Sequence, residues 1–388
     1  MPGPRPWYSR ITDRRPDAFG AEPTGARLAR IEGSPNFVDG AFRNPVPTRR
    51  LIPGSFGPSL RAGLTKKGSK PAGAVPVHPL TPGELSVPPA SGLRLTWMGH
   101  ATVLAEIAGR RVLFDPVWGE RCSPFAGFGP RRLHPTPLPL AELGPIDLVV
   151  VSHDHYDHLD MHAIRTLIHS GADFAVPLGV GAHLEHWGVP ADRITELDWQ
   201  ESARVAGLTL TATPARHYCA RGLRTGTHQL WASWVVAGAE HRLFHSGDTG
   251  YFPGFAEIGA AYGPFDATMM QVGAYSDFWP EVHMTPEEGV RAHGDLGAEA
   301  VLLPIHWATF DLAPHRWEEP IERTLAAAAA AGVTVATPRP GEPFEPAATP
   351  QVQPWWRPIA AVVPTPDPTA PSRTEPPRTD PQPEQVRV

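Results

Sequence analysis

The sequence predicts an α/β fold in which two packed sheets are covered by helices on their outer faces. Short runs rich in β-branched residues begin at residue 93, and a run at 147–151 that is apolar after its first residue, Asp147, precedes a segment with helical spacing at 159–169. Strand and helix patterns then alternate up to about residue 345. A strand meander followed by mixed strands and helices is typical of such a layered arrangement.

The individual elements follow from local patterns. The runs at 93–98, 102–107 and 111–114 are separated by turn sequences and predict a meander. The apolar run after Asp147 indicates a buried strand at 147–151. Thr285 is expected to cap a helix over 286–296, with proline first and acidic residues in its first turn. Further strands are expected at 174–176, 208–213, 230–236, 242–245, 267–272 and 300–305.

Composition divides the chain into three zones. Residues 1–90 are rich in Pro, Gly and Arg, and we expect them to form a basic N-terminal arm that packs on the body. Residues 91–345 are expected to form the main folded domain. Residues 346–388 are expected to be a disordered tail, since 13 of the 46 residues from 343 onward are Pro and little apolar area can offset the chain entropy.

Charge is distributed unevenly. Residues 1–70 carry 13 Lys/Arg and 5 Asp/Glu, whereas residues 71–350 carry 17 basic and 31 acidic residues. The basic arm either wraps the acidic body or contacts an anionic surface such as lipid headgroups, and both interpretations stay open. A nucleic-acid partner is disfavoured because a phosphate backbone needs a basic track.

Cysteine usage and the first residues bear on location. The chain has two cysteines, Cys122 and Cys219, which is no disulfide framework and suits a reducing compartment. The first 30 residues lack an apolar core, so we expect no signal peptide. No apolar run reaches the ~18 residues of a membrane span. These features predict a cytoplasmic protein, and they leave its oligomeric state open.

The seven residues after the buried strand are rich in side chains of the types that bind metal ions. It reads Ser152-His153-Asp154-His155-Tyr156-Asp157-His158. Alternate residues of an extended turn point the same way, so His153 and His155 can share one ion while Asp157 and His158 turn toward a second. Zinc accepts imidazole nitrogen and carboxylate oxygen, and two ions ~3.5–4 Å apart can hold a bridging hydroxide. The motif therefore predicts a two-metal hydrolytic site rather than a solvated polar loop.

A two-metal site needs more ligands, and each candidate follows a predicted strand. His217 follows 208–213, Asp248 follows 242–245 and His306 follows 300–305. A carboxylate can bridge two cations, which a neutral imidazole cannot do, so Asp248 is the natural shared ligand. The alternatives are a surface histidine, a turn aspartate and a core histidine, respectively.

This set of motifs resembles the metallo-β-lactamase superfamily, and more narrowly the N-acylphosphatidylethanolamine-hydrolysing phospholipase D group within it. The likeness runs from about residue 30 to 320. The stretches that carry it include Ser34-Pro-Asn-Phe-Val-Asp-Gly, Asn44-Pro-Val-Pro-Thr, Trp97-Met-Gly-His-Ala-Thr, Phe114-Asp-Pro-Val-Trp, Gly129-Pro-Arg-Arg, Val151 through Asp160, Trp231-Ala-Ser-Trp, Ser246-Gly-Asp-Thr-Gly-Tyr, Val282-His-Met-Thr-Pro-Glu-Glu and Ile305-His-Trp-Ala-Thr-Phe.

The resemblance implies an αββα sandwich of two mixed sheets, with two zinc ions at one edge, iron or manganese being alternatives. One zinc would take His153, His155 and His217, the other would take Asp157, His158 and His306, and Asp248 would be shared. The implied reaction is hydrolysis of a phospholipid phosphodiester by a zinc-bridging hydroxide that Asp157 and Asp248 help to hold.

Three other residues receive roles beside the ligands. His283 is expected to polarise or protonate phosphoryl or leaving oxygens, the alternative being a histidine at a helix entry. His100 and Asp115 are expected to hydrogen-bond to the ligands from behind. Cys219 is expected to be a free thiol rather than a soft ligand.

Two features bear on the substrate. After Gly273-Ala-Tyr the related pattern is Glu-Pro-Arg-Trp, but this chain has Ser276-Asp277-Phe278-Trp279, which removes a bidentate anion contact. The alternatives are therefore a phosphosugar lactonase on the same two ions and, in another class, a non-catalytic zinc-binding module. Four aromatic residues favour a lipid substrate over a sugar phosphate: Phe125, Phe128, Trp187 and Trp279. Peripheral contact with an anionic membrane would involve the basic arm.

Overall fold

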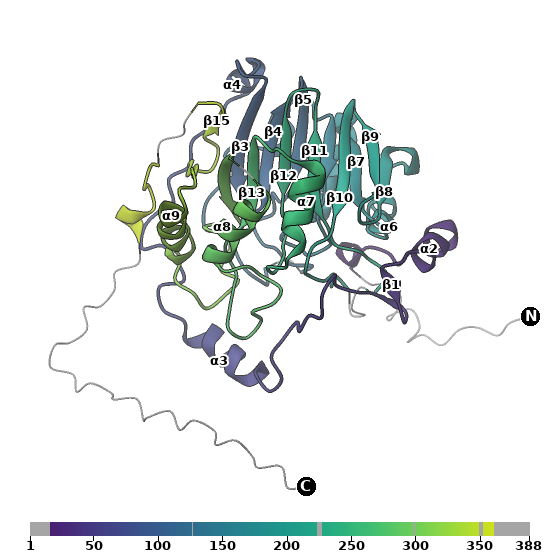
Figure 1. Cartoon of the computed structure of the whole chain (residues 1–388), viewed down its shortest axis with the longest axis horizontal. Coiled ribbons are helices and arrows are strands. Elements are labelled where there is room, and N and C mark those ends of the chain that lie inside the picture. The colour runs from purple at the N-terminus through teal and green to yellow at the C-terminus, as the bar shows by residue number, and fades with distance from the viewer. Residues whose placement is uncertain (1–15, 126, 223–226, 298, 349–351, 361–388) are drawn as a thin grey trace, which may run out of the picture.

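Two β-sheets packed face to face form the centre of the fold (Figure 1). The structure is a computed structural model that describes residues 16–125, 127–222, 227–297, 299–348 and 352–360. Residues 1–15 of the expected arm and 361–388 of the expected tail lie outside this description. Among the described residues, no helix combines the length and the apolar character needed to cross a membrane.

The first sheet has seven strands and contains the expected meander. Strands β3, β4 and β5 pair antiparallel, and β5 to β8 then pair parallel. In order across the sheet the strands are β15 (Pro343–Phe344), β3 (Leu93–Gly99), β4 (Thr102–Ile107), β5 (Arg110–Phe114), β6 (Leu148–Val150), β7 (Asp173–Pro177) and β8 (Ile194–Leu197).

The second sheet has six strands. Strands β9 to β12 pair antiparallel, and β12, β13 and β14 pair parallel. In order across the sheet the strands are β14 (Val301–Ile305), β13 (Ala267–Gln271), β12 (Arg242–His245), β11 (Ser233–Ala237), β10 (Leu208–Thr213) and β9 (Ser202–Val205). The three strands of these sheets that the sequence did not lead us to expect, β8, β9 and β15, lie at sheet edges.

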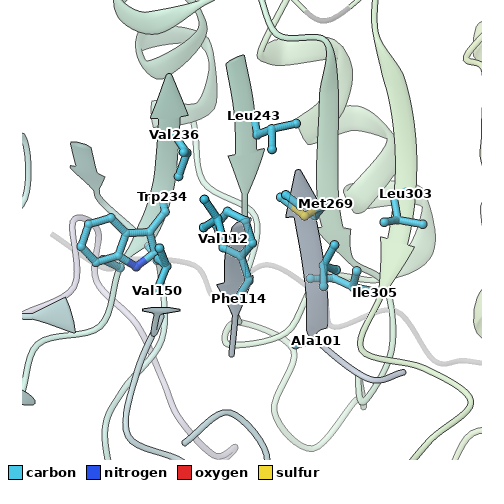
Figure 2. Packing of buried hydrophobic residues seen from close by; sticks show 14 of the residues in the cluster. Ala101, Val112, Phe114, Val150, Trp234, Val236, Leu243, Met269, Leu303 and Ile305 are labelled. Atoms are coloured by element: carbon cyan, nitrogen blue, oxygen red, sulfur yellow. The ribbon is translucent and has the colours of Figure 1, made fainter. Parts of the chain in front are cut away.

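Alternation of side chains along the strands produces four layers. Val112 and Phe114 of β5 point into the core between the sheets, whereas Leu113 points to the outer face. Figure 2 shows the inner cluster, in which Met269 and Ile305 of the second sheet face Phe114. Helices α5 (Met161–Leu167) and α6 (Gly181–His186) pack on the outer face of the seven-stranded sheet, and α7 (Gly254–Tyr262), α8 (Pro286–Asp295) and α9 (Glu319–Ala331) pack on that of the six-stranded sheet. The predicted fold class is confirmed.

The predicted helix cap is also confirmed. The Thr285 side chain accepts a hydrogen bond from the Glu288 backbone, and the Glu288 side chain bonds back to Thr285. The helix expected at 159–169 is α5 followed by a 3-10 turn, η3 (Ile168–Ser170). Short 3-10 segments also occur at η1 (Asp17–Phe19), η2 (Leu140–Glu142), η4 (Ala191–Arg193) and η5 (Arg357–Ile359).

The arm contacts the body at several points along its length. Its elements are α2 (Gly25–Glu32), β1 (Phe37–Val38), β2 (Ala41–Phe42), α3 (Phe56–Thr65) and α4 (Pro82–Ser86). Ile31 is fully buried, and the Ser34 hydroxyl donates to Asp198 at 2.5 Å. Helix α3 lies below the sheets and projects away from them (Figure 1).

The start of the expected tail differs from the expectation. Residues 352–360 pack on the body, and Trp356 is fully buried with its indole N–H donating to Glu322 at 2.7 Å. Trp355 stacks on Trp307 at 5.3 Å between ring centroids. Two adjacent tryptophans can bury enough area to order a segment that is otherwise rich in proline.

Candidate metal centre

The candidate ligands come from loops at matching ends of the strands. Strand β6 runs parallel to β5, and β12 and β14 both run parallel to β13, so their carboxyl ends meet at one edge of the sandwich. His153 through His158 follow β6, Asp248 follows β12 and His306 follows β14. His217 follows β10, which has the same direction as β12.

Four of these side chains form a first group. His155 Nδ1 lies 2.9 Å from His153 Nε2 and 3.3 Å from His217 Nε2. Asp248 Oδ2 lies 3.9 Å from His153 Nε2 and 3.8 Å from His217 Nε2. These four donor atoms all lie within 4.8 Å of one another.

A second group lies on the other side of Asp248. Asp157 Oδ2 is 3.3 Å from His306 Nε2 and 3.7 Å from His158 Nε2. Asp248 Oδ2 is 3.1 Å from both of those imidazole nitrogens. The same carboxylate oxygen therefore faces both groups, as the chemistry of a shared ligand requires.

The donor set fits two metal ions. Two nitrogens bound tetrahedrally to one zinc at about 2.0–2.1 Å lie roughly 3.3 Å apart, close to the separations within each group. His158 Nε2 and Asp248 Oδ1 are buried and have no hydrogen-bond partner among the described residues. Buried polar atoms without a partner are rare and need an explanation, and a cation held at these atoms supplies one.

The electrostatics agree with the chemistry of the donors. Burial and the neighbouring imidazoles hold the pKa of His153 well below its usual value, so this ring is neutral and carries a free lone pair. Burial raises the pKa of Asp248, but the imidazoles of His158, His306 and His283 hold it well below its usual range. Burial lowers the pKa of His306, yet Asp248 and Asp157 raise it to about 9. The negative charges of Asp248 and Asp157 that stabilise a proton on His306 would also stabilise a metal cation bound between these side chains.

Asp115 and His100 each hydrogen-bond to a candidate ligand. Asp115 Oδ2 accepts a hydrogen bond from His158 Nδ1 at 2.7 Å, and His100 Nε2 donates to Asp157 Oδ2 at 2.9 Å. His217 Nδ1 donates to the Val282 carbonyl at 2.9 Å, which leaves its Nε2 facing the first group. Such contacts orient an imidazole and fix its tautomer.

The backbone at the centre adopts sparsely populated conformations. His100, Asp115 and His306 have φ values of 54°, 40° and 66°, in the left-handed region that non-glycine residues rarely adopt. Each conformation costs free energy that the surrounding structure must offset. Strain at three residues of one site indicates that the site itself, rather than local stability, determines these backbone angles.

Several contributors were not predicted. Ser152 Oγ donates to Asp115 Oδ2 at 2.7 Å and lies 2.9 Å from His153 Nδ1, and its place next to the motif is a local signal that could have indicated it. Asn44 in the arm brackets His217: its Oδ1 accepts from the His217 N–H at 2.8 Å and its Nδ2 donates to the His217 carbonyl at 2.9 Å. The Asn44-Pro-Val-Pro-Thr motif was the available signal for that contact.

Other candidates lie away from the centre. Cys219 is buried with its thiol 3.4 Å from the Leu230 carbonyl, outside the metal-ligand groups. Trp187, one of the four aromatic residues taken to favour a lipid substrate, is 4% exposed and packs in the core on the outer face of the first sheet, so it cannot contact a lipid. Phe125 and Phe128 are 51% and 73% exposed, and Trp279 is partly buried beside Ala274.

Comparison with known proteins places the chain in a family. Residues 110–307 match the Beta-lactamase superfamily domain. The chain is 48% identical over 363 residues to a protein of Mycobacterium tuberculosis, covering 90% of this chain and 95% of that one. It is 39% identical over 250 residues to the N-acyl-phosphatidylethanolamine-hydrolyzing phospholipase D 1 of Caenorhabditis elegans, covering 61% of this chain and 69% of that one.

A solved structure supports the fold independently. Igni18, a metallo hydrolase from Ignicoccus hospitalis, superposes with a TM-score of 0.51 at 23% identity, covering 65% of this chain and 98% of that one. At this level of identity the likeness concerns the fold alone. The family match and the similar proteins show that the chain is a metal-dependent hydrolase that belongs to the metallo-β-lactamase superfamily.

Proposed function

We propose that this protein is a dizinc phosphodiesterase of phospholipase D type that hydrolyses N-acylphosphatidylethanolamine-like lipids. The observation that carries the proposal is the position of Asp248 Oδ2, which is 3.1 Å from His158 Nε2 and His306 Nε2 and also faces His153 and His217. A carboxylate between two ligand groups suits a pair of cations. The choice of lipid rests on the likeness to the phospholipase D of Caenorhabditis elegans.

Under this proposal His153, His155 and His217 would hold one zinc and Asp157, His158 and His306 the other, with Asp248 available to both. The chemistry that the ions supply is activation of water at neutral pH and neutralisation of charge on the phosphoryl oxygens. Asp157 and Asp248 are ionised, because nearby imidazoles hold their pKa values well below the usual range despite burial. Their charges partly offset that of the ions and orient the attacking water.

His283 is assigned to the substrate. Its Nε2 lies 3.8 Å from Asp248 Oδ2, and its side chain is 13% exposed, so it reaches the site and the solvent-facing mouth. Burial lowers the pKa of His283 to about 4, so the ring is neutral near pH 7. A neutral imidazole can donate one N–H to a phosphoryl or leaving oxygen without placing another positive charge beside the ions.

Metal content and a substrate panel test the proposal. The purified protein is analysed for metal and then assayed, zinc-loaded, on N-acylphosphatidylethanolamine, phosphatidylcholine and a phosphosugar lactone, with Asp248→Asn as the inactive reference. The expected result is roughly two zinc ions per chain and release of phosphatidic acid from the N-acylated lipid. Hydrolysis of the lactone alone would assign the lactonase reaction instead. Fewer than about one ion per chain would contradict a dizinc site.

The same proposal includes peripheral contact with an anionic membrane through α3. Phe56, Leu60 and Leu64 recur every fourth residue on this helix and are 74%, 57% and 79% exposed. Such a stripe would cover one helix face with apolar side chains. The basic residues Arg61, Lys67 and Lys70 lie on or just after the helix and form no ion pair with the described part of the chain.

A cleft lies between the C-terminal end of α3 and the catalytic domain. It has a volume of about 1370 Å³ and is lined by Leu64 and Lys70 from the arm and by Arg121, Arg131 and Arg132 from the body. Two acidic residues, Asp311 and Glu120, also line it, and Glu120 pairs with Arg131 at 2.6 Å. Apolar side chains surrounded by basic ones fit a bilayer that carries anionic headgroups. A cytoplasmic enzyme could reach its lipid substrate from such a surface.

Vesicle flotation tests the contact. Leu60→Ser/Leu64→Ser protein and the parent are mixed with phosphatidylcholine vesicles that do or do not contain phosphatidylserine. The parent should float with the anionic vesicles only, and the double variant should stay behind while still hydrolysing a water-soluble diester. Equal flotation of the two proteins would remove α3 from the contact.

A further inference from the structure

The arm carries a positive charge to the metal centre at Arg50. Hydrogen bonds fix the backbone before and after Arg50. The Arg49 N–H donates to Glu281 at 2.5 Å, and the Ile52 N–H donates to the Phe278 carbonyl at 2.9 Å. Glu281 lies two residues before His283 in the chain. The arm therefore crosses the loop that carries His283, and Arg50 is positioned between its two points of attachment.

The guanidinium of Arg50 lies over a ring that contacts the ligands. Its Cζ is 4.8 Å from the centroid of Tyr218. The Tyr218 ring in turn lies 4.9 Å from the rings of both His155 and His217. Only one aromatic ring thus separates this cation from the first ligand group, and stacking on that ring restricts the conformations of the arginine.

Arg50 differs from neighbouring cations in its partners. Arg49 pairs with Glu281 at 3.3 Å, and Lys66 pairs with Asp311. Arg50 is exposed and forms no ion pair with any residue that the structure describes. The facing loop, Ser276 to Trp279, offers an aspartate and no basic side chain. Arg50 forms no ion pair with that aspartate, so its guanidinium is available to an anionic ligand.

We propose that Arg50 is a specificity-determining residue that binds an anionic oxygen of the substrate phosphodiester beside the metal centre, next to Tyr218. The proposal rests on the proposed function, since it assumes a phosphodiester substrate. The planar guanidinium can donate two parallel N–H bonds to one phosphate group. Such a contact holds substrate and transition state alike, so it acts on KM more than on kcat.

Kinetics on two soluble substrates test this role in the zinc-loaded full-length protein. Arg50→Gln and Arg50→Lys are compared with Arg43→Gln, an exposed arginine of the same arm that pairs with Asp39 at 3.7 Å. With bis(4-nitrophenyl) phosphate, Arg50→Gln should raise KM about 10-fold at nearly unchanged kcat, the size expected for losing an exposed hydrogen bond to a charged group. Arg50→Lys should recover part of the loss, and Arg43→Gln should behave like the parent. Hydrolysis of uncharged 4-nitrophenyl acetate should not change.

Two further measurements separate this proposal from the function on which it rests. Zinc content should be the same in all variants, and dibutyl phosphate should bind about 10-fold more weakly to Arg50→Gln by calorimetry. If the parent cleaves N-acylphosphatidylethanolamine but both Arg50 variants keep its KM and its affinity for dibutyl phosphate, the role of Arg50 is wrong. If no diester is cleaved but dibutyl phosphate binding still depends on Arg50, the proposed reaction fails and the anion site stands. Equal losses on the charged and uncharged substrates would also overturn the role.

Discussion

Asp115 Oδ2 accepts a hydrogen bond from His158 Nδ1 at 2.7 Å, and both side chains are fully buried. The same carboxylate accepts bonds from the Ser152 backbone and hydroxyl at 2.7 Å each. Asp115 therefore ties the end of β5 to the first residues of the motif after β6. Asp115 contacts His158 at Nδ1 and not at the Nε2 that faces Asp157 and Asp248. Removing Asp115 therefore tests how the position of a ligand affects metal binding without removing a ligand.

Replacing Asp115 with Ala should weaken zinc binding about 10–100-fold, because His158 loses the partner that orients its ring. Competition with a chromogenic chelator measures this affinity. Asp147→Asn is the matched control: Asp147 lies just before β6, at the opposite end of the β5–β6 pair from Asp115, and pairs with Arg110 at 2.9 Å. An Asp115→Ala protein with the parent's zinc affinity would show that the contact serves folding alone.

Variants of Asp248 and His283 should differ in which property they lose: the first should lose metal, and the second should keep metal but turn over more slowly. Asp248→Ala removes the oxygen that faces both ligand groups, so both ions should be lost on gentle dialysis. His283→Ala should keep the metal and lower kcat about 10²–10⁴-fold, the range for loss of a positioned acid or base group. Metal analysis and initial rates on a chromogenic diester measure the two effects. Zinc loss from the His283 variant would reassign that histidine as a ligand.

The sequence was informative where function follows a strong local pattern. His217, Asp248 and His306 each come directly after a strand with many β-branched or apolar residues, so the end of the strand located the ligand. Parallel strands bring such ends together, which is why the two groups could be anticipated without coordinates. The layered fold was predictable for the same reason, since strand periodicity is local.

Contacts between distant segments were not predictable. Asn44 and His217 are separated by 173 residues, and no periodicity links them. The same holds for Arg50 over Tyr218 and for Trp356 on the body. For Trp187 the sequence was misleading. The sequence alone does not show whether an aromatic side chain faces the solvent or the core, and this one lies in the core.

Trp356 should stabilise the fold although it lies in a proline-rich segment. It is fully buried, and its indole N–H donates to Glu322 at 2.7 Å. Trp356→Ala should lower the free energy of unfolding by about 3–5 kcal/mol, as for other large core truncations. Urea denaturation at fixed zinc concentration measures the change. Val352→Ala, at a residue 46% exposed in the same segment, should change it by less than about 0.5 kcal/mol. Similar values for the two variants would mean that the segment does not hold the body together.

His241 should make a contribution to stability that depends on pH. Burial lowers its pKa, but hydrogen bonds to Asp266 at 2.9 Å and to the Ser91 carbonyl at 2.8 Å raise it above its ordinary value. The folded state therefore binds the proton more tightly than the unfolded chain, whose histidine titrates near about 6.5. The contribution is fully present below that pH and disappears as the pH rises through the folded-state value.

The difference in unfolding free energy between the parent and His241→Gln measures this contribution directly, because effects of pH on the metal centre are common to both proteins. The difference should be largest near pH 5.5 and should shrink steadily toward pH 9, the range being set by a pKa raised from about 6.5. A difference that grows with pH would mean that His241 is neutral when it bonds to Asp266, and that the ring acts there as an uncharged donor joining the turn before β12 to the start of β13.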